Sequence, residues 1–328
     1  MLNVQELFIE PPIPHPFHSN EFPLWMPAGF EPNERIGITS QFLENAATYH
    51  KDYYNPDAIR SILWRMLPKE IANLEEPVFL DIGSGSGNTV IALLDMFTKP
   101  HVIALDLSEN LLGILSSIVH REYSGRDVVY FCADATKGYL RDAVVDCVIG
   151  SAILHHIVDP VLALHNAAMA VRPGGYLCFM EPFEAGYSAI RLVYEHILEL
   201  EPYRHPKLPD SVREAMERTI RDWSARTNVG VLRDITSSLD DKWLMTRHFF
   251  EKAAIASNCT LVSIADYDAS IPLSARAVYD LFEHFEQPIP ELPDWVLKQI
   301  ARLDSAFSPS SRRDMICYGL VLLKKNET

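Results

Sequence analysis

The chain has 328 residues, of which 48% are hydrophobic and 22% are charged, so its composition is that of a globular protein with room for one large domain or two small ones. Its formal net charge of −15 argues against a nucleic-acid partner, because binding to a phosphate backbone depends on clustered Lys and Arg side chains. The sequence has no apolar run long enough to span a membrane, no signal-like start and no paired cysteines, so we expect a cytoplasmic protein with reduced thiols and no membrane partner.

Residues 1–75 are predicted to form an extended arm followed by helices. Seven of the 22 prolines lie in the first 34 residues, and proline fixes φ and removes a backbone donor, which favours an extended chain. Because this segment is also rich in aromatic side chains, we expect it to lie across the domain surface or against a second subunit, and a homodimer formed through the arm is one assembly that this allows. Apolar residues at helical spacing then predict helices within 39–50 and 59–66.

The segment 78–90 is an apolar strand that runs into Asp81 and three alternate glycines, Gly83, Gly85 and Gly87. Glycine adopts φ values closed to other residues, so the chain can turn sharply here and bring backbone N–H groups close to a ligand. A dinucleotide-binding turn would need its third glycine at position 88, which is Asn88 in this chain. The pattern therefore predicts a nucleotide-binding turn that is not built for NAD.

Strands and helices alternate up to residue 182, which predicts a parallel sheet. The second strand ends in Asp106, 19 positions beyond Gly87, and a carboxylate at about that distance is placed to bind both hydroxyls of a ribose. The third strand ends at Asp134, the fourth leads into Ser151 and a pair of histidines, and the fifth ends at Glu181.

The pattern Asp-x-Gly-x-Gly-x-Gly, with Leu-His-His-x-x-Asp-Pro and Arg-Pro-Gly-Gly further on, resembles that of class I S-adenosylmethionine-dependent methyltransferases. The resemblance covers residues 76–182 and implies an α/β fold with a Rossmann-like sheet of seven strands, mostly parallel with an antiparallel last strand. Segments 260–264 and 315–323 are predicted to form the last two strands. The predicted core is 76–182 with 245–328, and a helical cap over the acceptor site occupies 183–244.

The resemblance also implies S-adenosyl-L-methionine as the methyl donor and S-adenosyl-L-homocysteine as the product. In the family an acid at the position of Asp134 accepts from the adenine amino group, and the next backbone N–H serves a ring nitrogen. The predicted cofactor-binding residues are Asp81, Gly83, Ser84, Gly85, Gly87, Asp106, Leu107, Asp134, Ala135 and Ser151.

Methyl transfer from a sulfonium requires the acceptor atom to lie behind the methyl carbon in a site that excludes water, and a hydroxyl acceptor also needs a base for its proton. The fourth and fifth strands deliver His155, His156 and Glu181 to one sheet edge, so these are the predicted catalytic residues or acceptor contacts. Histidines packed against the backbone are the alternative, and one tyrosine of segment 49–54 is a further candidate contact. No His and Cys cluster has zinc-ligand spacing, so no metal is predicted.

These features predict a methyltransferase for a small-molecule acceptor, with O-methylation of a sugar or secondary metabolite as the leading hypothesis. An Asn-Pro-Pro-Tyr motif, typical of amino-group methylation on bases or amides, does not follow the fourth strand, where the chain reads Ser-Ala-Ile-Leu. A C- or N-methyltransferase of a small metabolite is the alternative within the same class. A cofactor-binding or assembly protein without turnover is the alternative from a different class, because a fold does not by itself imply chemistry.

Overall fold

The structure is a computed structural model that describes residues 4–19, 22–30, 44–231, 239–267, 269–283, 285 and 289–327. Part of the first predicted helix (39–43) and part of the predicted cap (232–238) lie outside the described residues.

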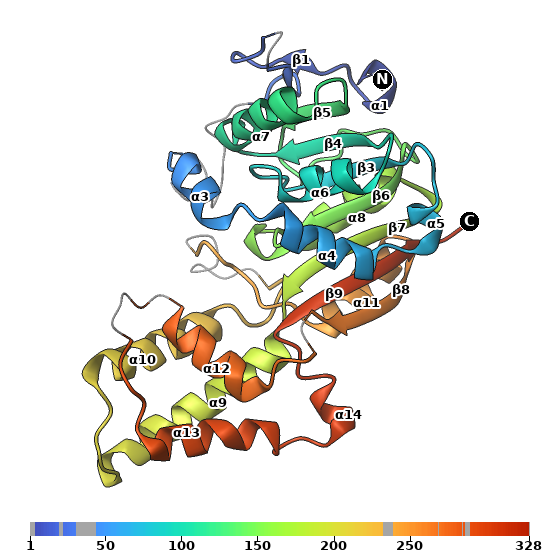
Figure 1. Ribbon diagram of the computed structural model, residues 1–328. Coiled ribbons are helices and arrows are strands. Elements are labelled where there is room, and N and C mark those ends of the chain that lie inside the picture. The colour runs from blue at the N-terminus through green and yellow to red at the C-terminus, as the bar shows by residue number, and fades with distance from the viewer. Residues whose placement is uncertain are drawn as a thin grey trace.

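A sheet of nine strands, in the order β1-β2-β5-β4-β3-β6-β7-β9-β8, runs through the molecule (Figure 1). Its five central strands are mutually parallel, whereas β9 is antiparallel to both of its neighbours. The prediction of a mostly parallel sheet with an antiparallel last strand is therefore confirmed. The strands concerned are β3 (Val78–Ile82), β4 (His101–Asp106), β5 (Asp127–Cys132), β6 (Val145–Ser151), β7 (Val171–Pro182), β8 (Cys259–Asp266) and β9 (Tyr318–Lys325).

The N-terminal arm adds two strands to the seven that the sequence predicts. After the short helix α1 (Val4–Leu7), β1 (Ile13–Pro14) pairs antiparallel with β2 (Leu24–Met26), and β2 pairs in parallel with the edge of β5. Leu24 is fully buried in this position. The arm thereby covers backbone groups that an open sheet edge would expose, and the predicted count of seven strands is corrected to nine. A homodimer through the arm stays a prediction.

Helices cover both faces of the sheet because successive strand residues point to opposite sides. Apolar side chains of α4 (Pro56–Met66), α6 (Asn88–Met96) and α7 (Glu109–Glu122) pack on one face. Those of α8 (Pro160–Ala170) and α11 (Arg247–Ala256) pack on the other. The remaining short elements are α3 (Ala46–Tyr53), α5 (Lys69–Ala72), α14 (Pro309–Arg312) and the 3-10 helices Leu154–His156, Glu201–Tyr203 and Arg302–Asp304.

A helical bundle lies beyond the end of β7 and forms its own apolar core (Figure 1). Its helices are α9 (Glu184–Leu200), α10 (Asp210–Ala225), α12 (Leu273–Phe282) and α13 (Asp294–Ala301). The bundle thus combines the segment predicted as a cap with helices from the segment 245–328 that the sequence assigned to the core. Among the residues that the structure describes, no helix has the length and apolarity to cross a membrane.

Candidate functional site

A cavity of about 350 Å³ opens where β3, β4, β5 and β6 end, a volume within the usual range for a small-molecule site. The open-sheet rule places ligands at this carboxyl edge. Eight of the predicted site residues line the cavity: Gly83, Gly85, Asp106, Leu107, Asp134, Ala135, Ser151 and His156. The five others, which lie behind its wall, are Asp81, Ser84, Gly87, His155 and Glu181.

The glycine turn has two packed residues and one that faces open space. Gly83, Gly85 and Gly87 have φ values of 69°, 52° and 106°, in the left-handed region. A Cβ on Gly83 would lie 2.4 Å from a carbon of Ile153, and one on Gly87 would lie 2.3 Å from a carbon of Leu115. A Cβ on Gly85 would meet no atom within 4 Å. The turn therefore presents backbone at the cavity wall, while Gly87 is needed for the packing of α6.

Asp106 joins the end of β4 to this turn. Its Oδ2 accepts from the backbone N–H of Gly85 at 2.8 Å, and its Oδ1 accepts from the N–H of Ser108 at 2.8 Å. A carboxylate oxygen can accept more than one hydrogen bond, so these contacts orient the group and leave it capable of binding ligand hydroxyls. Ser108 in turn caps α7 by accepting from Leu111 N–H.

Asp81 is buried beneath the turn without a hydrogen-bond partner. Its side chain is 1% exposed, and neither carboxylate oxygen has a partner among the described residues. Burial, followed by the nearby charge of Asp106, raises the pKa of Asp81 well above its usual value. A buried carboxyl group without a partner is unfavourable when it is ionised, so this group is suited to a ligand that brings a positive charge to the turn.

Asp134 shapes the loop after β5, where its Oδ1 accepts from the N–H and the hydroxyl of Thr136, both at 2.8 Å. This local turn holds Asp134 and the following residue, Ala135, on the cavity wall.

Glu181 does not line the cavity, contrary to the expectation from sequence. Its side chain is fully buried, and it accepts from the backbone N–H groups of Ile153, Leu154 and His155 and from the His155 ring. The shortest contact, His155 Nδ1–H to Oε2, is 2.6 Å long. Since four donors surround this carboxylate, Glu181 holds the loop after β6 in place instead of contacting an acceptor.

The two adjacent histidines have different surroundings. His155 is 6% exposed, and its carbonyl accepts from Lys242 N–H and Trp243 N–H, so the packed alternative applies to it. His156 lines the cavity, and its Nδ1–H donates to the carbonyl of Asp240 at 3.1 Å. Burial, followed by the neighbouring charge of His155, lowers the pKa of His156 to about 3, so its ring is neutral near pH 7.

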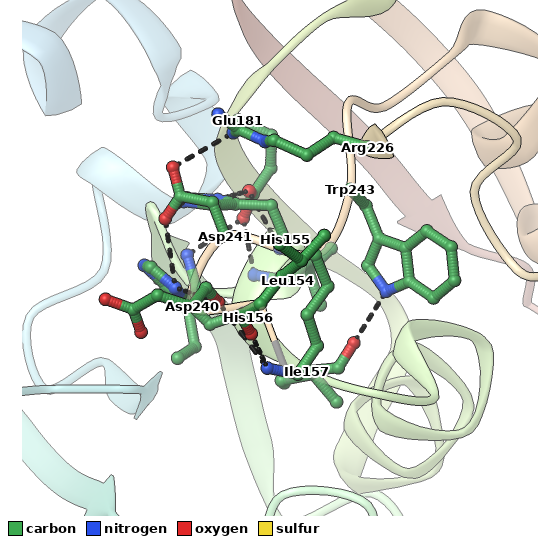
Figure 2. A network of polar contacts seen from close by, with 12 residues as sticks. Leu154, His155, His156, Ile157, Glu181, Arg226, Asp240, Asp241 and Trp243 are labelled. Atoms are coloured by element: carbon green, nitrogen blue, oxygen red, sulfur yellow. Dashed lines mark hydrogen bonds and ion pairs between the residues drawn. The ribbon is translucent and has the colours of Figure 1, made fainter. Parts of the chain in front are cut away.

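The segment 239–243 packs against the loop after β6, a contact that sequence reasoning missed, and Asp240 of this segment lines the cavity. Asp241 lies 3.4 Å from Nδ1 of His156 and 3.7 Å from Nε2 of His155 (Figure 2). Its other oxygen pairs with Arg226, which follows α10, at 3.0 Å, and Trp243 Nε1–H donates to the carbonyl of Ile157 at 2.8 Å. No local motif predicts the contacts with the two histidines and Ile157, because they join residues about 85 positions apart.

Two aromatic residues from the N-terminal third, Phe30 and Tyr49, also line the cavity. Tyr49 is the tyrosine of segment 49–54 that reaches it. Burial, followed by the charge of Asp106, raises the pKa of Tyr49 to about 12, so its hydroxyl stays protonated near neutral pH.

Comparison with known proteins identifies the central part of the chain. Residues 80–179 match a family model described as "Methyltransferase domain". The chain is 30% identical over 146 residues to malonyl-[acyl-carrier protein] O-methyltransferase of Marinomonas sp. (strain MWYL1), covering 44% of this chain and 49% of that protein. It is 27% identical over 160 residues to ubiquinone biosynthesis O-methyltransferase of Coxiella burnetii, covering 45% and 64%. The matches thus span about half to two thirds of these relatives.

Solved structures share the fold at low identity. Phosphoethanolamine N-methyltransferase 2 of Haemonchus contortus, in complex with S-adenosyl-L-methionine, has a TM-score of 0.53 at 16% identity and covers 92% of this chain and 62% of that chain. The [4+2]-cyclase SpnF has a TM-score of 0.50 at 12% identity, with coverage of 83% and 81%. At such identities the likeness shows the fold alone, which confirms the predicted Rossmann-like architecture.

Proposed function

We propose that this chain, whose residues 80–179 form a class I S-adenosylmethionine-dependent methyltransferase domain, transfers a methyl group from S-adenosyl-L-methionine to a small molecule. The observation that carries the proposal is the cavity where Gly85, Asp106 and Asp134 meet, with the unpartnered carboxyl group of Asp81 beneath it. A glycine turn, two acids at strand ends and a buried carboxyl group are the groups that an adenosyl ligand with an ammonium group requires.

The residues of the cavity fit the parts of such a ligand. Asp106, already oriented by two backbone donors, would accept from the ribose hydroxyls, and Asp134 with Ala135 would bind the adenine. Asp81 and the turn would serve the methionyl end, where a positive charge would relieve the cost of burying an ionised carboxylate. When bound, S-adenosyl-L-methionine supplies a methyl group activated by its sulfonium.

A hydroxyl group is the acceptor that we propose, and a secondary metabolite or sugar is the substrate class. In the reaction the acceptor oxygen forms a bond to the methyl carbon, the carbon–sulfur bond breaks with its electron pair on sulfur, and the hydroxyl proton passes to water. The two relatives named above are O-methyltransferases, which supports oxygen as the acceptor atom. Of the three predicted catalytic residues, His156 lines the cavity, and we assign it the contact with the acceptor.

A binding protein without methyl transfer is the second candidate function. The fold is shared with a protein titled a [4+2]-cyclase, so the fold does not settle the reaction.

Turnover separates these functions. We would incubate the protein with S-adenosyl-L-methionine and a panel of hydroxylated metabolites, and measure by mass spectrometry the release of S-adenosyl-L-homocysteine and the acceptor that gains a methyl group. Release together with a methylated product supports the proposal. Tight binding of S-adenosyl-L-methionine without product across the panel would favour the binding protein.

A further inference from the structure

We propose that His155, His156 and Asp241 bind a divalent transition-metal ion of the Zn²⁺ type at the edge of the cavity. One ligand atom from each of these side chains lies within 4.8 Å of the other two. The three residues come from two segments, the loop after β6 and the segment 239–243, that meet only in the folded protein (Figure 2).

The distances suit a metal ion without a large rearrangement. Zn²⁺ binds imidazole nitrogen and carboxylate oxygen at about 2.0–2.2 Å, which places the ligand atoms of a tetrahedral site about 3.4 Å apart. Asp241 Oδ1 lies 3.4 Å from Nδ1 of His156 and 3.7 Å from Nε2 of His155. Two imidazoles and one carboxylate are also the ligand set of catalytic zinc sites that keep a fourth position open.

Neighbouring groups orient these ligands as in known metal sites. His155 Nδ1–H donates to buried Glu181 at 2.6 Å, so Nε2, on the side of Asp241, is the ring nitrogen left to bind a metal ion. A carboxylate behind a ligating histidine is the usual arrangement around zinc. Arg226 holds Oδ2 of Asp241 at 3.0 Å, which leaves Oδ1 on the side of the histidines. Metal binding by Nδ1 of His156 would replace its hydrogen bond to the carbonyl of Asp240.

The side chains around the cluster carry more negative than positive charge, and a divalent cation would balance the excess. Glu181, Asp241 and Asp222 carry three negative charges when ionised, and Arg226 offsets one of them through its contacts with both aspartates. Asp240 and Lys242, which follow one another closely in the same segment, add one group of each sign. A histidine must be neutral to bind a metal ion, so with both histidines as ligands these groups would carry a charge of −2, which a cation of charge +2 would balance.

The position of the cluster suggests what the metal would do. His156 and Asp240 line the cavity, so an open coordination position beside His156 would face a bound acceptor. A divalent ion there would orient an acceptor hydroxyl and ease the loss of its proton to water, while the oxygen forms its bond to the methyl carbon. This role rests on the proposed methyl transfer, whereas metal binding does not.

The test is calorimetric titration of the purified, chelator-treated full chain with Zn²⁺, repeated with Co²⁺ to record the absorption bands of the bound ion. We expect one saturable ion per chain with nitrogen ligation in the Co²⁺ spectrum. Asp241→Asn and His156→Ala should each weaken Zn²⁺ binding by about tenfold or more, and Glu181→Gln by about ten- to a hundredfold as an outer partner of a ligand. His248→Ala, which removes an exposed surface histidine, is the matched control and should leave binding unchanged.

Absence of saturable binding by the wild-type chain would overturn the metal site, whether or not the variants fold. Equal binding by Asp241→Asn and wild type, or an equal loss in His248→Ala, would overturn it too. The metal's role is tested separately: if the chelator-treated enzyme methylates as fast as the Zn²⁺-loaded enzyme, the role at the acceptor is wrong although methyl transfer stands. If Zn²⁺ binds and S-adenosyl-L-methionine does not, the proposed function fails while the metal site stands.

Discussion

Two strand ends behind the cavity wall use buried carboxyl groups in opposite ways. At the end of β3, Asp81 is buried with neither oxygen hydrogen-bonded, whereas at the end of β7, Glu181 is buried among four donors. The first leaves a carboxyl group without partners, which the proposed function assigns to a ligand, and the second uses a carboxylate to fix a loop. The comparison teaches that an acid at a strand end has no fixed role, because the donors that the fold brings to it decide between binding and support.

Glu181→Ala should have the largest effect on stability. It would leave three backbone N–H groups and the His155 ring donor without their buried acceptor, so we expect a loss of about 3–5 kcal/mol in the free energy of unfolding. Denaturant unfolding followed by circular dichroism measures the change. A loss below about 1 kcal/mol would mean that this carboxylate does not support the loop.

Asp81→Asn should change stability in the opposite direction. Replacing this unpartnered buried carboxyl group is expected to raise the free energy of unfolding of the ligand-free protein by about 1–3 kcal/mol near pH 7, and to weaken binding of S-adenosyl-L-methionine. Thermal unfolding and calorimetric titration measure the two effects. Asp127→Asn, which removes a carboxylate paired with His101 at 2.6 Å, is the control and should not stabilise the protein. If Asp81→Asn destabilises the ligand-free protein, the contrast with Glu181 disappears.

The raised pKa of Asp81 predicts that the free energy of unfolding depends on pH. Because the folded protein raises the pKa of Asp81 above its usual 3.8, the folded state binds this proton more tightly than the unfolded state. The contribution of Asp81 to stability is therefore fully present below about pH 3.8 and is lost as the pH rises through the raised pKa. The difference in unfolding free energy between Asp81→Asn and wild type should grow with pH over this window. A difference that is constant with pH would show that Asp81 does not titrate with a raised pKa.

Asp106→Ala tests whether a strand-end acid that lines the cavity binds a ligand. It should weaken binding of S-adenosyl-L-methionine by about 1–3 kcal/mol, because a charged acceptor of ligand hydroxyls is lost. Asp127→Ala, at the opposite end of the neighbouring strand, is the matched control and should leave the affinity as it is. Titration calorimetry of both variants measures the affinity for S-adenosyl-L-methionine. If the two variants have the same affinity, Asp106 does not bind the ribose.

The glycine turn and the acid after it could be predicted from the sequence because their signals are local. The strand, the alternate glycines and Asp106 lie within 30 residues, and each glycine has the left-handed backbone that its residue type favours. The arm was harder to place, since a three-residue strand such as β2 has too little pattern to distinguish it from a loop. The two extra strands follow from pairing with β5, which a single segment does not reveal.

The acceptor side could be predicted only in part. The sequence placed His155, His156 and Glu181 at the correct edge, but not the direction in which each side chain points. Asp241 was missed because it lies 85 positions after His156, and the expectation of no metal rested on spacing along the chain. The structure brings Asp241 beside both histidines, so the cluster depends on how segment 239–243 packs and not on a motif.

The central claim is that the carboxyl edge of the sheet forms a pocket for S-adenosyl-L-methionine. Calorimetric titration of the wild-type chain with this ligand, beside Asp106→Ala and Asp127→Ala, tests it most directly. The account predicts saturable binding that Asp106→Ala weakens and Asp127→Ala preserves. No binding by the wild-type protein, or binding that is indifferent to Asp106, would contradict it.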